Sequence, residues 1–195
     1  AVVVRGGQTM NPSVQDLIGA VAEVNADTTV LLPNNPNVVR TAQQAAEMSE
    51  HRLRVVRTRS LPQGVTAMLA MNPELDAESN VAAMERAMAS VKSGEVVASV
   101  RASTVDGVQV PEGALMGLLD DKLVAVGGSS GEVLTRLVAR ASPAEGSIVT
   151  LYWGSGLSPG RVEADAAALR EGVPGVEVET VEGGQPHYLY LVAVE

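Results

Sequence analysis

The 195-residue sequence contains no cysteine, no phenylalanine, one tryptophan and two histidines. Without cysteine, the chain cannot form a disulfide, a thiolate zinc site or a cysteine nucleophile. With only His51 and His187, a histidine-rich metal site is excluded as well. The scarcity of aromatic side chains leaves no platform on which nucleic acid bases could stack. The chemistry available to this protein is therefore sparse.

Long apolar runs and an excess of positive charge are also missing. No apolar run approaches the roughly 20 residues that cross a bilayer, so we expect no membrane span. The 23 acidic residues outnumber the 14 basic ones, and the formal charge of -9 repels nucleic acid phosphates. Since 46% of the residues are hydrophobic, a packed core can still form. These features indicate a soluble cytoplasmic protein that has no membrane span and does not bind nucleic acid.

The chain opens without an initiator methionine and without the charged region of a signal peptide. Residues 2–4 are all valine and predict a buried strand. Because a globular protein rarely begins in its core, we expect the chain to be a piece of a longer protein.

The first half alternates predicted helices and strands. Ser13 and Asp16 have the spacing of a capping box and predict a helix that begins there. The alternation with short loops is typical of a parallel α/β sheet. The expected elements are helices over 13–24, 37–48, 64–71 and 74–92, and strands over 28–32 and 53–56.

The pattern changes near Ser93 and Gly94. Asp106-Gly107 and Asp120-Asp121 predict tight turns between antiparallel strands, and the chain closes with a βαβ unit. We therefore predict an α/β protein of two subdomains, with a parallel α/β half over 1–93 and a mixed-sheet α+β half over 94–195. The elements expected in the second half are strands over 95–105, 115–119, 123–126, 148–153, 176–181 and 188–194, and helices over 132–140 and 162–170.

Residues 127–131 fit the G-x-S-x-G nucleophile elbow of hydrolases, with Ser129 as nucleophile. His187 and Asp165 are the available base and orienting acid. However, the predicted strand before Ser129 ends a hairpin, whereas an elbow follows a central parallel strand. We therefore favour a glycine turn with a serine helix cap, and a hydrolase that uses Ser129 remains an alternative.

Two other patterns have structural explanations of the same kind. The loop over 154–160 loosely resembles a dinucleotide-binding turn, but Ser158 as a helix cap and Pro159 in the first turn explain it. No phosphate-binding G-x-x-x-x-G-K-[ST] motif is present. A basic stripe that could contact a phosphate or simply face solvent is formed by Arg52, Arg54, Arg57 and Arg59.

A Gly-Gly-Gln run occurs near both ends of the chain, at 6–8 and 183–185, each time beside a predicted strand. We interpret the two runs as facing loops. The side chains expected to line one polar cleft between them are Gln8, Asn11, Asn34, Gln63, Gln185 and His187. The structural alternative for His187 is an ordinary surface or core histidine. The ligand or cleft candidates are Gly6, Gly7, Gln8, Thr9, Asn11, Ser13, Asn34, Asn35, Gln63, Gly64, Gly183, Gly184, Gln185 and His187.

Collinear runs extend along almost the whole chain, among them Gly-Gly-Gln-Thr-Met-Asn-Pro-Ser at 6–13, Leu-Leu-Pro-Asn-Asn at 31–35 and Ser-Leu-Pro-Gln-Gly at 60–64. Together with Gly-Leu-Leu-Asp at 117–120 and Gly-Gly-Gln-Pro at 183–186, they resemble the C-terminal region of bacterial fatty acid kinase A-type proteins. The ATP domain of those proteins is related to dihydroxyacetone kinase. The resemblance implies that the parent protein phosphorylates a fatty acid held by a separate DegV-type protein, which yields acyl-phosphate for phospholipid synthesis. It also implies that ATP and Mg²⁺ belong to the absent kinase domain, so this chain is expected to be non-catalytic and to hold no cofactor.

The same segments are similar, in degenerate form, to the DegV-type fatty-acid-binding proteins themselves. Residues 7–12 resemble their Ser-Gln-Pro-Ser-Pro element without its serine, and His187 follows the terminal glycine-rich element instead of lying within it. The resemblance implies a DegV-like architecture that serves to dock the fatty-acid-binding partner. The alternative is a DegV-like binder of a fatty acid or another small carboxylate.

The negative charge of the chain predicts a basic face on the partner, because complementary charge accelerates encounter. A homodimer formed through the absent regions is compatible with this interpretation. The acids expected to bind the partner are Asp106, Glu112, Asp120 and Asp121 on the hairpin loops, and Glu177, Glu179 and Glu182 near the terminal Gly-Gln loop.

Overall fold

The computed structural model describes residues 1–4, 6 and 11–195. These residues form two compact units, Ala1–Ser90 and Val91–Glu195. The predicted boundary lies between residues 93 and 94. The two units divide three residues earlier, because strand β3 (Lys92–Ala98) belongs as a whole to the second unit.

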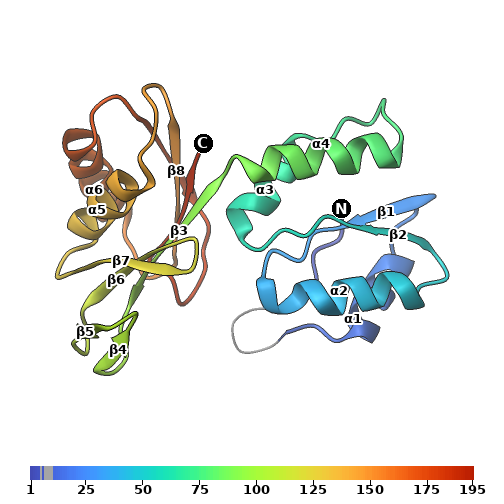
Figure 1. Ribbon diagram of the computed structural model, residues 1–195, viewed down its shortest axis with the longest axis horizontal. Coiled ribbons are helices and arrows are strands. Elements are labelled where there is room, and N and C mark those ends of the chain that lie inside the picture. Colours follow the sequence, from blue (N-terminus) through green and yellow to red (C-terminus); the bar gives the residue numbers. More distant parts are fainter. Residues whose placement is uncertain (5, 7–10) are drawn as a thin grey trace. The chain divides into compact units, whose positions relative to one another are not determined.

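The first unit is built on a pair of parallel strands, in register from Thr28↔Arg52 to Leu31↔Val55. Figure 1 shows helices α1 and α2 on one side of this pair and α3 and α4 on the other. The alternation of helix and strand predicted from the sequence is confirmed. The elements are α1 (Val14–Ala22), β1 (Thr28–Leu31), α2 (Pro36–Met48), β2 (Arg52–Val55), α3 (Leu61–Leu69) and α4 (Ala77–Ala89).

Two small apolar clusters hold this unit together, one on each face of the strand pair. Leu17 and Val21 of α1 pack with Ala42 and Ala45 of α2 and with Leu53 on one face. On the other face, the side chains of Val56, Ala67 and Met84 are buried together. Because consecutive strand residues point to opposite faces, β1 contributes Leu31 to the first cluster and Val30 to the second.

Helix α1 begins with the predicted capping box. The Asp16 backbone N–H donates to the Ser13 hydroxyl oxygen, and the Ser13 backbone N–H donates to the Asp16 carboxylate. Hydrogen bonds from the Ser13 side chain and backbone lower the pKa of Asp16. Two backbone donors that the helix leaves without an internal partner are thereby satisfied.

Two predicted elements of this unit are wrong in part. Residues 2–4 do not form a strand, and Val3 is 85% exposed, because the valine pattern alone provides no neighbouring strand to pair with. The last helix begins at Ala77 instead of Glu74, since Asp76 is its N-cap. The buried Asn80 side chain holds the preceding turn by donating to the carbonyls of Asn72 and Leu75.

The second unit contains a six-stranded sheet in the order β7-β6-β3-β10-β8-β9. All neighbouring strands are antiparallel except β8 and β9, which are parallel and joined by α6, as the predicted βαβ unit requires. The hairpin of β4 (Ser103–Val105) and β5 (Val108–Val110) turns at Asp106-Gly107, as predicted. The remaining elements are β6 (Leu115–Leu119), β7 (Lys122–Gly127), α5 (Ser130–Ala141), β8 (Ile148–Trp153), α6 (Pro159–Gly172), β9 (Glu177–Glu182) and β10 (Tyr190–Val194).

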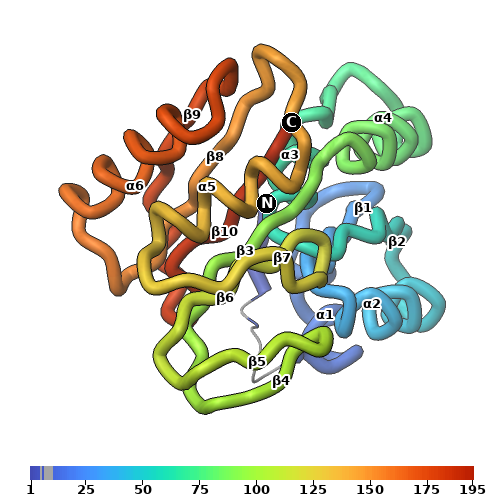
Figure 2. Tube along the Cα trace, turned by 60° about the vertical axis from the view of Figure 1, so that its left-hand side comes forward, coloured from blue at the N-terminus to red at the C-terminus, as the bar shows by residue number. Residues whose placement is uncertain are grey.

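Helices α5 and α6 lie side by side on one face of this sheet (Figure 2). A Cβ atom added to Gly94 of β3 would lie 2.7 Å from Leu137 Cδ2, so glycine lets α5 pack closely against the sheet. Gly131 of α5 lies against Asp165 of α6, and Gly172 of α6 lies against Thr135 of α5. The two helices therefore run in the same direction, and their C-terminal ends lie near each other.

Each edge strand of the sheet is contacted by an arginine from one of the two helices. Arg136 of α5 donates to the Val126 carbonyl of β7 over 2.9 Å, and Arg170 of α6 donates to the Val178 carbonyl of β9 over 3.3 Å. Exposed strand edges invite pairing with other chains, and such contacts obstruct it.

Candidate functional site

The polar residues of the first unit gather where β1 and β2 end and α2 and α3 begin. The Asn34 backbone N–H donates to the Thr58 hydroxyl over 3.0 Å, and that hydroxyl donates to Asn34 Oδ1 over 2.8 Å. Asn34 adopts a left-handed backbone with φ of 55°. A Cβ atom added to Gly64 would overlap the Asn34 side chain, so this glycine makes room for it. Ligands of α/β proteins commonly bind at this edge of a sheet.

The neighbouring candidates of this edge are hydrogen bonded as well. Asn35 caps α2 by accepting from the Asn37 backbone N–H over 2.8 Å. Gln63 Oε1 accepts from the Arg59 backbone N–H over 2.8 Å. The side-chain amide nitrogens of Asn34, Asn35 and Gln63 donate no hydrogen bond within the described part of the chain. The structure therefore brings four predicted candidates together and leaves amide donors there.

Thr58 was missed by the sequence analysis, although it follows β2 as Asn34 follows β1. Of the basic stripe, Arg54 is paired with Glu78, with 2.6 Å between Nη2 and Oε1. Ser13 is a helix cap, and Gly6 and Asn11 are exposed. Gly7, Gln8 and Thr9 lie outside the described residues, and so does the predicted cleft between Gln8 and Gln185.

The glycine-rich loop before β10 folds back over the end of β8. Gly183 and Gly184 donate their backbone N–H groups to the Trp153 carbonyl over 2.9 and 3.1 Å. The Gln185 Nε2 group donates to the Tyr152 carbonyl over 2.7 Å, while Gln185 Oε1 is buried without a hydrogen bond. His187 is exposed. The loop thus uses its candidate residues mainly to hold its own shape.

The serine-rich turns of the second unit are helix caps. Ser129 is the N-cap of α5 and accepts from the Glu132 backbone N–H, as the favoured interpretation predicts. Ser158 caps α6 in the same way, with Pro159 in the first turn. Asp165 binds Ser130 and Tyr190, so it does not act as the orienting acid expected for a triad with His187.

A buried polar cluster connects α5, α6 and β10, and the sequence analysis missed it. Asp165 Oδ2 accepts from the Ser130 hydroxyl over 2.5 Å and from the Tyr190 hydroxyl over 2.9 Å. Arg161, one turn earlier on α6, donates to both Asp165 and Ser130. Only the Arg161–Asp165 spacing is visible in the sequence, because Ser130 and Tyr190 come from distant segments.

Burial of the Tyr190 phenol and its hydrogen bond to Asp165 raise the pKa of Tyr190 well above its ordinary value. Tyr190 therefore keeps its proton and remains a donor. The three donor side chains compensate the loss of hydration of a carboxylate that is only 3% exposed. The cluster therefore stabilises the packing of α5, α6 and β10 against one another.

The face of the six-stranded sheet opposite α5 and α6 carries a carboxylate near its centre. Glu95 of β3 lies between Leu118 of β6 and Leu191 of β10 in the strand register. Burial, and secondarily the negative charge of Asp121, raise the pKa of Glu95. Glu95 forms no hydrogen bond or ion pair with the described residues.

The acids predicted to bind a partner differ in their local roles. Glu177, Glu179 and Glu182 are exposed along the edge strand β9. By contrast, Asp106 accepts from the Leu123 backbone N–H, and Asp120 accepts from the Ser93 backbone N–H.

The turn positions of the hairpin acids explain this difference. Asp106, Asp120 and Asp121 have left-handed backbones, which aspartate tolerates better than most residues. Glu112 is exposed in the turn between β5 and β6. Replacing the hairpin aspartates would therefore disturb the fold as well as the charge.

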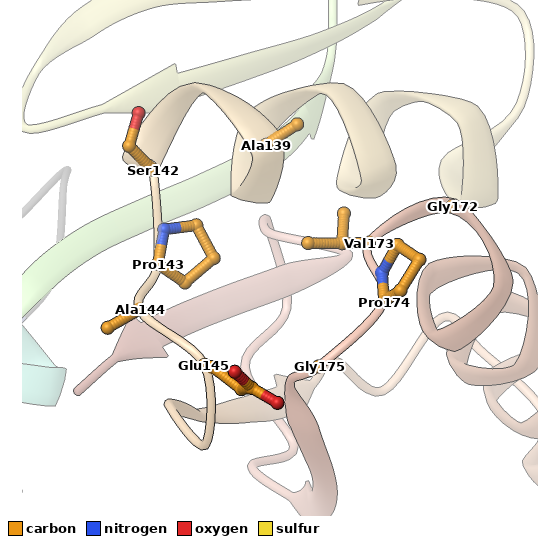
Figure 3. A pocket seen from close by; sticks show the side chains of 9 residues that line it. All are labelled: Ala139, Ser142, Pro143, Ala144, Glu145, Gly172, Val173, Pro174 and Gly175. Atoms are coloured by element: carbon orange, nitrogen blue, oxygen red, sulfur yellow. The ribbon is translucent and has the colours of Figure 1, made fainter.

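An open groove of about 540 Å³ lies where α5 and α6 end, and Figure 3 shows the side chains that line it. Its walls come from the loop after α5 and the loop after α6. Glu145 is the one charged residue among the described residues that line it. No group of three or more His, Asp or Glu side chains suited to a metal ion occurs among the described residues.

The whole chain, residues 1–195, matches the FakA-like C-terminal family, which is the C-terminal domain of fatty acid kinase A-like proteins. The chain belongs to this family. It is 39% identical over 195 residues to protein YloV of Bacillus subtilis (strain 168), and 33% identical over 193 residues to an uncharacterized protein of Staphylococcus aureus (strain USA300). These matches cover 100% and 99% of this chain but 35% of each relative. The family domain thus spans about a third of the length of its curated relatives.

Solved structures with the same fold include a fatty acid kinase B protein and DegV family proteins. The fatty acid kinase (Fak) B3 protein of Streptococcus pneumoniae, loaded with linoleic acid, matches with a TM-score of 0.63 at 15% identity, over 94% of this chain and 76% of that chain. A DegV family protein of Corynebacterium glutamicum matches with a TM-score of 0.67 at 14% identity, over 94% of this chain and 83% of that chain. The predicted DegV-like architecture is therefore confirmed. In the described part of the family domain, no helix is long and apolar enough to cross a membrane.

We expect Asp165→Asn to lower the free energy of unfolding by about 3 kcal/mol, because its amide presents a donor to side chains that are themselves donors. Glu163→Gln on the same helix removes only an exposed ion pair with Arg170, and is expected to change the free energy by less than about 1 kcal/mol. Urea unfolding followed by circular dichroism measures both variants. Equal free energies of unfolding for the two variants would contradict a stabilising role of the Asp165 cluster.

We expect Glu95→Gln to raise the free energy of unfolding at pH 7. Because the pKa of Glu95 is raised in the folded protein, the folded state binds this proton more tightly than the unfolded chain does. Its contribution therefore becomes less favourable as pH rises through the folded pKa. The advantage of the variant should disappear as pH falls below 4.5, the ordinary value for glutamate.

Unfolding curves at several pH values, with the exposed Glu112→Gln as control, measure the Glu95 effect. A pH-independent difference between Glu95→Gln and the native protein would show that burial of the charge is not its cause.

Proposed function

We propose that this domain docks a DegV-type fatty-acid-binding protein onto a fatty acid kinase, so that the ATP domain can phosphorylate the bound fatty acid. The acyl-phosphate formed would supply phospholipid synthesis in the cytoplasm. The observation that carries the proposal is the match of the whole chain to the FakA-like C-terminal family of fatty acid kinases. In this proposal, ATP and Mg²⁺ are bound by another part of the full protein.

The local chemistry supports docking over catalysis. Ser129, which resembled a nucleophile, caps a helix. The buried Asp165 carboxylate accepts hydrogen bonds from Ser130, Arg161 and Tyr190. An acidic surface remains along β9, where Glu177 and Glu179 project from the same face of the strand by alternation. Exposed charges of one sign accelerate encounter with an oppositely charged partner more than they deepen affinity. A basic face on the partner fits this surface.

The second candidate function is binding of a fatty acid or another small carboxylate. The amide donors of Asn34, Asn35 and Gln63 at the strand ends favour it, since N–H groups at helix starts suit a carboxylate. The domain also shares its fold with the Fak B3 protein, whose structure was solved with linoleic acid bound. Against it, the Asn34 side chain fills the space above Gly64 and is bound to Thr58.

We expect the double variant Glu177→Lys/Glu179→Lys to associate with the fatty-acid-binding protein of the same organism on the order of tenfold more slowly at low salt. The difference should shrink as salt rises, because exposed charges are screened beyond about 8–10 Å at physiological ionic strength. Stopped-flow or surface plasmon resonance measures the rate. Glu74→Lys/Glu85→Lys reverses two exposed acids of the first unit and serves as the matched control. Equal rates for both double variants would contradict docking through β9.

We expect the purified domain to carry no acyl chain in native mass spectrometry, since the docking proposal requires none. The fatty-acid-binding protein, prepared in the same way, serves as the positive control. An added mass of one fatty acid on this domain, lost in Asn34→Leu, would favour the second candidate function instead.

A further inference from the structure

The groove at the ends of α5 and α6 is shaped by a fixed contact between its two loops. The Gly146 backbone N–H donates to the Gly175 carbonyl over 2.7 Å and ties the loops together. Gly175 has φ of 87° and lies beneath the Glu145 side chain, because a Cβ atom added there would be 3.6 Å from Glu145 Cγ. Figure 3 shows Glu145 next to Gly175 on this loop pair. Glu145 lines the groove and is exposed.

The C-terminal ends of α5 and α6 both lie at the groove, and their last turns also carry Arg140 and Arg170. The last carbonyls of a helix lack intrahelical donors and carry the negative end of its dipole. After α6, Pro174 has no N–H to offer to the carbonyl of Arg170 four residues earlier. At the end of α5, the Lys92 ammonium group already donates to the Ala141 carbonyl. One of the two helix ends therefore binds a cation within the protein itself.

Most of the residues that line the groove are apolar or small. Pro143 and Pro174 lie on opposite loops, and Ala139 and Val173 contribute small aliphatic surfaces. A long aliphatic stem that ends in a positive charge matches this combination, because lysine and arginine cover apolar surface with their methylene groups while the charged head is hydrogen bonded. An anion or a purely apolar ligand would not match Glu145 and the helix ends.

We propose that this groove receives a lysine or arginine side chain of the docked partner protein. The stem would lie between Pro143 and Pro174, and the charged head would contact Glu145 and the carbonyls at the end of α6. The inference rests on the proposed docking function and gives it a specific anchor point. Glu177, which begins β9 shortly after Gly175, places the groove next to the acidic surface of that proposal.

The test measures equilibrium binding of the fatty-acid-binding protein of the same organism by isothermal titration calorimetry. Glu145→Gln removes the charge at nearly constant size and should weaken binding on the order of fivefold, the range of an ion pair at a surface. Ala139→Trp fills the groove without changing charge and should weaken binding to a similar extent. Glu85→Gln removes an equal charge from an exposed position of the first unit and should bind like the native protein.

The outcomes separate this inference from the docking function. If the native domain does not bind the partner, the docking function and the groove proposal both fail. If the native domain binds the partner, and Glu145→Gln and Ala139→Trp bind it as tightly as the native domain does, the groove proposal alone is overturned. Weakening by Glu145→Gln and Ala139→Trp, with the amide signals of Gly146 and Gly175 shifting in NMR spectra on addition of the partner, supports it.

Discussion

The carboxylate of Asp165 is the constraint on which the second unit depends. An unpaired charge at this depth would oppose folding, so the site is stable only with all of its donors in place. Those donors come from the start of α5, the start of α6 and the middle of the sheet. One buried group thereby sets the positions of three elements. Because the two helices run in the same direction, fixing their starts also fixes their ends, where the groove lies.

The sequence predicts well what is decided locally. Ser13 with Asp16, the Asp106-Gly107 turn and the Ser158-Pro159 helix start all occur as predicted, since each depends on residues a few positions apart. The parallel and antiparallel character of the two units follows from the same local signals. The DegV-like architecture needed in addition a resemblance to known proteins.

Local sequence patterns did not predict the contacts between residues that are far apart in the chain. Nothing near Asp165 indicates that Ser130 and Tyr190 will meet it, and nothing near Asn34 indicates Thr58. The opposite error occurred at residues 2–4, where a valine run was interpreted as a strand without a partner strand. Whether the facing Gly-Gln loops meet depends on residues outside the described part of the chain. Of the candidate site, only the cluster at the ends of β1 and β2 could therefore be anticipated.

The arginines at the two edges of the sheet restrict how this domain can associate. With a guanidinium group on the Val126 carbonyl and another on the Val178 carbonyl, neither edge offers an uninterrupted row of backbone groups to a further strand. A strand from another chain that paired with either edge of this sheet would have to displace one of these arginines. The two arginines therefore protect the six-stranded sheet against edge-to-edge aggregation.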